Sequence, residues 1–125
     1  MNNSLLVMAG GGIGALARYQ LGRFTLHTWG TGWPWGTLVA NLAGGLLMGL
    51  LAGWLAARAT GGEQLRLFLA VGVLGGFTTF SAFSLESFAM IERGQIGSAM
   101  LYIAVSVVGA IAALGLGLAA ARTLA

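Results

Sequence analysis

Four long apolar segments leave this chain with few ways to fold. They cover residues 5–24, 35–57, 65–91 and 97–121, and the linkers between them are short. Crossing a bilayer takes about 20 mostly apolar residues in an α-helix. Because lipid offers no partner to backbone N–H and C=O groups, only helices and closed barrels span membranes. The pattern predicts one all-α integral membrane domain over residues 1–125, with four transmembrane helices.

The composition agrees with a membrane protein and argues against several other classes. Hydrophobic residues make up 58% of the chain and charged residues 7%, against roughly 25% charged residues in soluble domains. Cysteine is absent, so neither a disulfide framework nor a thiolate metal site can form. The arginines are dispersed along the sequence, which argues against a nucleic-acid partner. The sequence contains no catalytic triad, phosphate-binding loop or cluster of metal ligands, and we expect no enzyme activity.

The arginines give only a weak preference for one orientation in the membrane. The first four residues lack Lys and Arg, so we expect the first segment to remain a membrane helix rather than a signal peptide. With four spans, Arg58, Arg66 and Arg122 face the side of the termini, and Arg23 and Arg93 face the other. Because positive charges favour the cytoplasmic side, two interpretations stay open. One extra arginine decides the orientation, or the chain inserts both ways and forms an antiparallel dimer with its inverted copy.

Small residues recur at intervals of four in three of the segments. Such ridges let helix backbones approach closely in a membrane. The ridges are Gly10 and Gly14, then Gly45, Gly49 and Gly53, then Gly109, Ala113 and Gly117. Four short helices enclose little interior volume, so a pore would need more than one subunit. We therefore expect a homo-oligomer.

The third apolar segment is too long and too polar in its middle to be one plain helix. At about 1.5 Å per residue it would extend about 40 Å, and residues 75–84 read Gly-Gly-Phe-Thr-Thr-Phe-Ser-Ala-Phe-Ser. We expect a break at Gly75–Gly76. Irregular backbone at membrane depth persists only where it is buried in protein or lines a hydrated cavity, so the break marks a functional site. Unwinding would free carbonyl oxygens, which are hard ligands suited to small cations.

Aromatic and hydroxyl side chains follow the predicted break. Phe80 and Phe83 are three residues apart, so on a continuing helix they share one face. Phenyl edges carry partial positive charge and can flank a small anion. Thr79, Ser81 and Ser84 add hydroxyl donors. Two other interpretations stay open: ordinary packing of the phenylalanines, and hydroxyls that bond back to the preceding turn.

Four further polar residues lie within the apolar segments: Arg18, Thr37, Asn41 and Glu86. Arg18 either snorkels to the interface or attracts an anion to a vestibule. Asn41 lies one turn after Thr37 and offers two N–H donors, either to an anion or to a neighbouring helix. Glu86 is the only carboxylate well inside a predicted span. It is a functional acid, an interfacial acid or the partner of an arginine.

Three motifs, in this order, resemble the CrcB/Fluc family of small bacterial fluoride channels. They are Gly-Ala-Leu-Ala-Arg-Tyr at residues 14–19, Gly-Thr-Leu-Val-Ala-Asn-Leu at 36–42, and the sequence at 75–84 followed by Glu86. The resemblance covers nearly the whole chain. It implies a multi-pass protein of the bacterial inner membrane that exports fluoride from the cytoplasm by passive electrodiffusion. It also implies an antiparallel dual-topology homodimer with two pores.

The same resemblance assigns roles to individual residues by position. A structural sodium ion (Na⁺) at the dimer centre would be held by backbone carbonyls of Gly75 and Thr78. Arg18 would lie near the aqueous vestibule and Glu86 beside the anion path. The amide and phenylalanines of that path would be Asn41, Phe80 and Phe83, with the hydroxyls of Thr37, Thr79, Ser81 and Ser84 nearby.

One departure from the family concerns the fourth helix. Similar proteins often carry hydroxyl residues there after a glycine, whereas Gly109 is followed by Ala-Ile-Ala-Ala-Leu. Tyr102 and Ser106, four residues apart, share a face of this helix by their spacing. Two other functions also fit a small membrane protein. A multidrug transporter would need a membrane carboxylate in a pocket for organic cations, for which Glu86 is the candidate, and a structural subunit of a larger complex would need no site.

Overall fold

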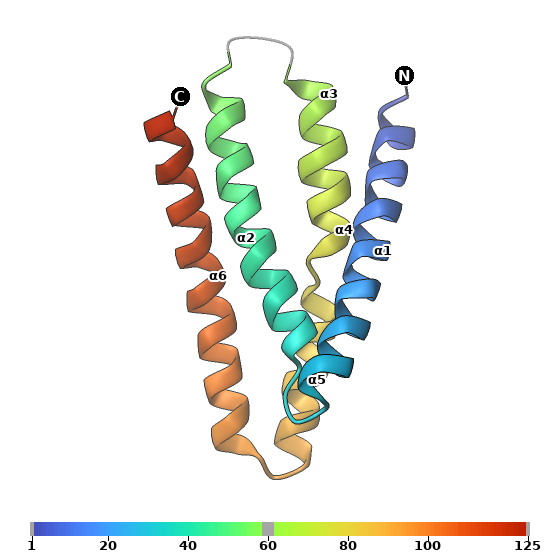
Figure 1. The fold of residues 1–125 in the computed structure, drawn as a ribbon, viewed down its shortest axis with the longest axis vertical. Helices are drawn as coiled ribbons and strands as arrows, with labels where there is room; N and C mark the ends of the chain where they lie inside the picture. The colour runs from blue at the N-terminus through green and yellow to red at the C-terminus, as the bar shows by residue number, and fades with distance from the viewer. Residues whose placement is uncertain (1, 59–61, 125) are drawn as a thin grey trace.

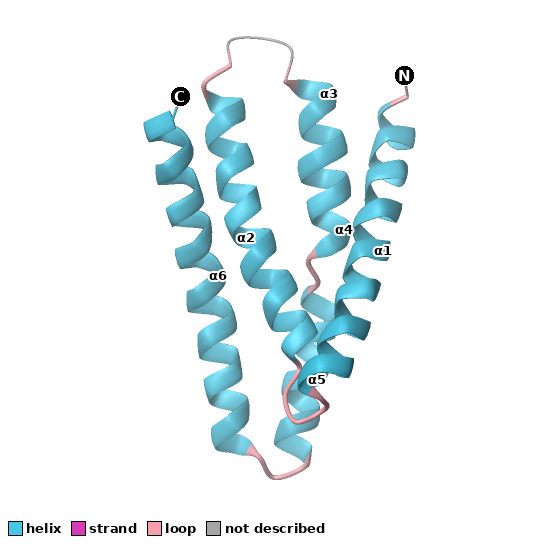
Figure 2. Cartoon of the chain, in the orientation of Figure 1, coloured by secondary structure: helices cyan, strands magenta, loops and turns pink. Residues whose placement is uncertain are grey.

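The chain folds into a bundle of long helices whose two termini lie at the same end (Figure 1). The structure is a computed structural model that describes residues 2–58 and 62–124. Within that part of the chain, helices are joined by short loops (Figure 2). The elements are α1 (Asn3–Trp29), α2 (Trp35–Ala56), α3 (Glu63–Leu65), η1 (Arg66–Leu74), α4 (Gly75–Phe77), α5 (Phe80–Glu92) and α6 (Ile96–Leu124). The predicted all-helical fold is confirmed, and α3 to α5 form its third, interrupted helix.

Three helical stretches are long and apolar enough to cross a membrane: α2, the run from α3 to α5, and α6. This confirms the prediction of a multi-pass membrane protein. The first helix, α1, is long, but Arg18, Gln20 and Arg23 lie in its second half and lower its hydropathy. That α1 crosses the membrane stays a prediction. Its packing against η1 and α4, which belong to an apolar stretch, supports it.

Helix α1 extends beyond the predicted span. It runs on to Trp29 and ends at Gly30, which has a φ of 78°. Glycine is the usual residue at such a left-handed helix end, and the Gly30 N–H donates to Leu26 O at 3.0 Å. The first loop is therefore residues 30–34 rather than 25–34. The predicted linker between the second and third helices includes residues 59–61, which lie outside the described residues.

The glycine ridge of α2 lies directly on the backbone of α6. A Cβ added at Gly45 would sit 2.7 Å from Ala110 O, and one added at Gly49 would overlap Leu114 O. At Gly53 it would come within 2.6 Å of the Ala121 Cβ. The close approach expected from the four-residue spacing is confirmed, and it makes the contact between α2 and α6 the most extensive in the bundle.

The third helix is broken, but the prediction that the break lies at Gly75–Gly76 is wrong. Gly75 has helical angles (φ −63°, ψ −37°) and the helix continues through Phe77. Thr78 (φ −85°, ψ 155°) and Thr79 (φ −150°, ψ 122°) are extended. The glycines serve packing instead, because a Cβ at Gly76 would lie 2.5 Å from the carbonyl oxygen of Gly11 in α1. The break falls at two β-branched residues, of which Thr79 is the N-cap of α5.

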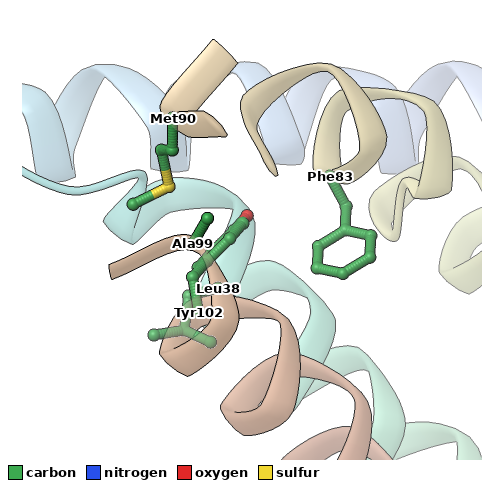
Figure 3. Packing of buried hydrophobic residues seen from close by; sticks show 5 residues of the cluster. All are labelled: Leu38, Phe83, Met90, Ala99 and Tyr102. Atoms are coloured by element: carbon green, nitrogen blue, oxygen red, sulfur yellow. The ribbon is translucent and has the colours of Figure 1, made fainter. Parts of the chain in front are cut away.

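A small core lies where α2, α5 and α6 meet. Figure 3 shows Phe83 and Met90 of α5 on one side and Leu38, Ala99 and Tyr102 on the other. These five residues form the cluster of buried hydrophobic side chains. Most other large apolar side chains are exposed, as expected for surfaces that face lipid or another subunit. The core therefore fixes α5, which carries the predicted site, against α2 and α6.

Candidate functional site

A chain of hydrogen bonds links four helices near the loop of residues 30–34. The Arg18 guanidinium donates through Nη2 to Thr37 Oγ1 at 2.9 Å. The Thr37 hydroxyl donates to Glu86 Oε2 at 3.0 Å, and the Tyr102 hydroxyl donates to Glu86 Oε1 at 3.1 Å. Three predicted site residues, from α1, α2 and α5, are thus brought together. Tyr102 of α6 completes the group, which we call the polar chain (Arg18, Thr37, Glu86 and Tyr102).

The polar chain keeps a positive and a negative group apart. The Arg18 guanidinium reaches Glu86 only through the Thr37 hydroxyl. Arg18 therefore turns inward to α2, which favours the vestibule interpretation over snorkelling. Its Nε is buried and has no hydrogen-bond partner within the described residues. A partly buried guanidinium with an unused donor can attract an anion.

The first cavity lies beside the polar chain. It has a volume of about 330 Å³ and is formed by the end of α1, the loop of residues 30–34, the start of α2, and α5. Its charged lining residues are Arg18, Glu86 and Arg93. Two guanidinium groups against one carboxylate give this cavity a positive balance. We call this cavity the vestibule.

Trp33 closes the vestibule on the side of α6. Its indole Nε1 donates to Ser98 Oγ at 2.7 Å, and its ring meets the Tyr102 ring edge-on with the centroids 5.5 Å apart. Because Tyr102 is fully buried, its hydroxyl is directed to Glu86 and not to solvent. The loop therefore holds one end of the polar chain in place.

The second cavity holds the predicted aromatic pair. It has a volume of about 390 Å³, and Asn41, Thr79, Phe80, Phe83 and Ser106 are among its lining residues. The Phe80 and Phe83 rings pack at 5.6 Å between centroids, tilted by 46°. Phe80 is 78% exposed and Phe83 is 8% exposed. The structure thus confirms that the two rings lie together, with Phe83 buried and Phe80 exposed at the surface of the bundle.

Phe83 lies beside the polar chain. Its ring lies 5.4 Å from the Tyr102 ring, and the Tyr102 hydroxyl belongs to the polar chain. Of the α5 residues, Phe83 lines the second cavity and Glu86, three positions on, lines the first. The two sets of predicted site residues therefore follow one another along α5, and we call them the α5 track.

Ser106 is a site residue that the sequence prediction did not include in the anion path. Its side chain is 4% exposed, and its Oγ has no hydrogen-bond partner within the described residues. Both Ser106 and Tyr102 are buried, which agrees with the shared helix face predicted from their four-residue spacing. Their signal in the sequence was polarity within an otherwise apolar helix. Beyond Ser106, α6 contributes Ala110, Ile111 and Leu114 to the second cavity, so the departure noted for the fourth helix leaves this part of the lining apolar.

The hydroxyls that follow the break are partly used by the helix itself. The Ser84 hydroxyl donates to Phe80 O at 2.9 Å, so for Ser84 the structure supports bonding to the preceding turn. Thr79 Oγ1 accepts from the Ala82 N–H at 3.2 Å and lies 3.4 Å from Ser81 Oγ. Thr79 therefore acts as a helix cap, and the exposed Ser81 hydroxyl lies next to it.

Asn41 binds the backbone of the break. Its Nδ2 donates to Thr79 O at 3.2 Å, and its Oδ1 accepts from the Thr79 N–H at 3.0 Å. Of the two interpretations left open, the structure shows the interhelical bond. An amide has two N–H donors, so one remains beyond Thr79 on a side chain that lines the second cavity.

Side chains suited to a metal ion are scarce. The residues that the structure describes contain no group of three or more His, Asp or Glu that could hold one. Backbone oxygens are the remaining hard ligands. The extended residues Thr78 and Thr79 interrupt the helical hydrogen-bond pattern beside the predicted ligands, the carbonyls of Gly75 and Thr78. Such carbonyl oxygens fit a small cation such as sodium.

Comparison with known proteins places these features in a family. The model of the family described as CrcB-like protein, Camphor Resistance (CrcB), matches residues 5–118. A protein of Phenylobacterium zucineum is 57% identical over 123 residues, which cover 98% of this chain and 97% of the relative. One of Novosphingobium aromaticivorans is 54% identical over 127 residues, which cover all of both chains. One of Sphingopyxis alaskensis is 52% identical over 124 residues, which cover 99% and 98%. All three relatives are named fluoride-specific ion channel FluC.

Proposed function

The chain belongs to the CrcB family, and we propose that it is a fluoride-specific ion channel that lets fluoride leave the cytoplasm by passive electrodiffusion. It is a multi-pass protein of the bacterial inner membrane. One observation carries the functional proposal. The second cavity brings together an amide, two phenyl rings and a buried hydroxyl without a partner, which are groups that can replace the water around a small anion.

Fluoride is small and holds its water strongly, so selection requires donors that replace the hydration shell. The vestibule attracts the ion through Arg18 and Arg93. Along the α5 track, the free N–H of Asn41, the Ser106 hydroxyl and the phenyl edges of Phe80 and Phe83 then supply positive partial charge. Larger and more weakly hydrated anions gain less from such donors, which supports specificity for fluoride.

A multidrug transporter is not favoured. Such a protein would present a free carboxylate to an organic cation, whereas both oxygens of Glu86 accept hydrogen bonds from hydroxyls. Among the described residues, Glu86 is the only acid that lines either cavity, and Arg18 and Arg93 line the same cavity. A purely structural subunit would not need such cavities.

Purified protein in liposomes tests the proposal. Vesicles loaded with potassium fluoride should release fluoride to an external electrode when valinomycin removes the electrical barrier, without any proton gradient. Release should not occur from vesicles without protein. Transport of an organic cation instead of fluoride would contradict the channel and support the transporter.

We further propose that the chain functions as an antiparallel dual-topology homodimer. The near balance of arginines on the two sides supports it. So does the exposed ring of Phe80, which lines the second cavity. An inverted copy laid against this surface would complete a second, equivalent path.

Dual insertion has a direct consequence for the C-terminus. A reactive tag placed after residue 125 should be reached from both sides of the membrane, because each dimer contains both orientations. Labelling with a reagent that does not cross membranes, in sealed cells and in inverted vesicles, measures this. Labelling confined to one side would contradict the antiparallel dimer.

Sodium is the cation that we propose for the dimer centre, held by the carbonyls of Gly75 and Thr78. The support is the position of the break beside these residues and the neutral charge of carbonyl ligands. A sodium ion there would hold the subunits together and would raise the anion affinity of nearby groups.

A further inference from the structure

Two N–H groups at the break are diverted from their helical acceptors. In a continuous α-helix each N–H bonds the carbonyl four residues earlier, so Thr79 would donate to Gly75 and Ala82 to Thr78. Instead, the Thr79 N–H donates to Asn41 Oδ1 at 3.0 Å. The Ala82 N–H donates to Thr79 Oγ1 at 3.2 Å. Two side chains thus take the donors that would otherwise occupy the Gly75 and Thr78 carbonyl oxygens.

We propose that Asn41 and Thr79 are positioning residues for the cation site, because their side chains release the Gly75 and Thr78 carbonyls for the ion. The inference rests on the proposed sodium site of the channel. It assigns Asn41 a second task besides the predicted contact with the anion. Thr79 was predicted only as a hydroxyl of the anion path. The inference gives it a second role, in which its side chain caps α5 by accepting the Ala82 N–H.

The Asn41 side chain makes two hydrogen bonds to the Thr79 backbone, which we call the clamp. The clamp requires an amide at position 41. One end of the Asn41 side chain accepts the Thr79 N–H while the other donates to Thr79 O. A carboxylate can accept but not donate, and a serine is too short to do both. Donation to Thr79 O also uses one of the two lone pairs of that carbonyl.

Contacts around Thr78 hold the other half of the break. The Thr78 N–H and its hydroxyl both donate to Leu74 O at 3.0 Å. The Thr78 methyl group lies where a side chain on Gly44 would be. Helix α2 therefore touches the break at two places one turn apart. One is the Asn41 amide, and the other is Gly44, whose lack of a side chain leaves room for the Thr78 methyl group. Together they fix the backbone angles of both threonines.

The clamp links the cation to the anion path. Asn41 lines the second cavity with Phe80 and Phe83, and the same side chain determines whether the Gly75 carbonyl is free. A change at Asn41 should therefore alter sodium affinity as well as fluoride flux. A residue that acted on the anion alone would alter only the flux.

Sodium-dependent stability of the purified protein tests the inference without relying on flux. The thermal midpoint of the detergent-solubilised dimer is measured while sodium chloride replaces N-methylglucamine chloride at constant ionic strength. The wild type should be stabilised by sodium with a saturable dependence. In Asn41→Ser, which loses two hydrogen bonds to the break, the half-saturating sodium concentration should rise about tenfold or more. In Thr79→Val, which loses the bond from the Ala82 N–H, it should rise about fivefold. Thr123→Val, which removes a hydroxyl at the end of α6, should keep the wild-type value.

Hydrogen exchange on the wild type provides a second test that needs no variant to fold. The Thr79 and Ala82 amides should exchange as slowly as their helical neighbours, because both are bonded to side chains. Fast exchange at either amide would overturn the inference. So would folded Asn41→Ser or Thr79→Val dimers with the sodium dependence of the wild type. A wild type that releases fluoride but does not respond to sodium would also overturn it while leaving the channel assignment intact, and absence of fluoride release would refute the channel itself.

Discussion

Asn41→Asp is expected to abolish fluoride efflux from proteoliposomes while the protein still assembles. A carboxylate at this position repels an approaching fluoride and offers no N–H donor. At about 4 Å and an effective dielectric constant of about 20, two like charges repel by about 4 kcal/mol, which corresponds to a roughly thousandfold lower flux. The carboxylate would also face Thr79 O without a proton to donate. Both effects act in the same direction.

A matched variant controls for the added charge. Gln95→Glu makes the same amide-to-carboxylate change in the exposed loop between α5 and α6, outside the lining of either cavity. Its efflux should stay within about twofold of the wild type, since an exposed charge outside both cavities is screened by water and salt. Efflux of Asn41→Asp equal to that of Gln95→Glu, from well-folded protein, would remove Asn41 from the anion path.

Gly49→Val is expected to prevent stable folding. The Cβ at this position would overlap Leu114 O and lie 2.8 Å from Leu118 N. These are backbone atoms of a neighbouring helix, so α2 and α6 would have to separate along their whole contact. Overpacking costs about 1–3 kcal/mol even where side chains can adjust, and a rigid backbone contact should cost more. The measurement is the yield of a single symmetric peak in size-exclusion chromatography, together with the thermal midpoint.

Gly115 of α6 supplies the control for this substitution. A Cβ there meets no atom within 4 Å, so Gly115→Val should fold and give a symmetric peak. The two variants add the same side chain to facing helices of one pair. If Gly49→Val were as stable as Gly115→Val, the close contact between α2 and α6 would be contradicted.

The helices could be predicted from the sequence because apolar length is a local property. The second span was expected at 35–57 and runs from Trp35 to Ala56. The first was expected to end at residue 24, but α1 continues to Trp29 and stops where Gly30 permits a positive φ. Hydropathy indicates which residues lie in lipid, but a helix can continue beyond them until its terminal backbone groups are capped.

The position of the break was harder to predict because glycine occurs both where a helix is interrupted and where another helix packs closely. The two cases look alike in the sequence. Gly75–Gly76 suggested flexibility, whereas Gly76 is small because Gly11 of another helix lies against it. The actual break depends on Asn41, which lies 38 positions before Thr79 in the sequence. No local pattern reports such a pairing. Only the arrangement of α2 against α5 brings the two residues together.

Individual site residues were predictable from their polarity in apolar segments, but their partners were not. Arg18, Thr37 and Glu86 stood out singly, and the structure joins them through hydroxyl bridges. Tyr102 and Ser106 carried the same signal in α6. Which of these polar groups is satisfied, as Tyr102 is, and which is not, as with Ser106 Oγ, depends on packing between helices.

The most direct test of fluoride-selective conduction is the reversal potential across a planar bilayer that contains the purified protein. With fluoride concentrations unequal on the two sides, and with chloride and proton gradients set to opposite values, the current should reverse at the equilibrium potential of fluoride. Reversal at the chloride potential would contradict selectivity. A current that follows the proton gradient, or no current from folded protein, would contradict a passive fluoride channel.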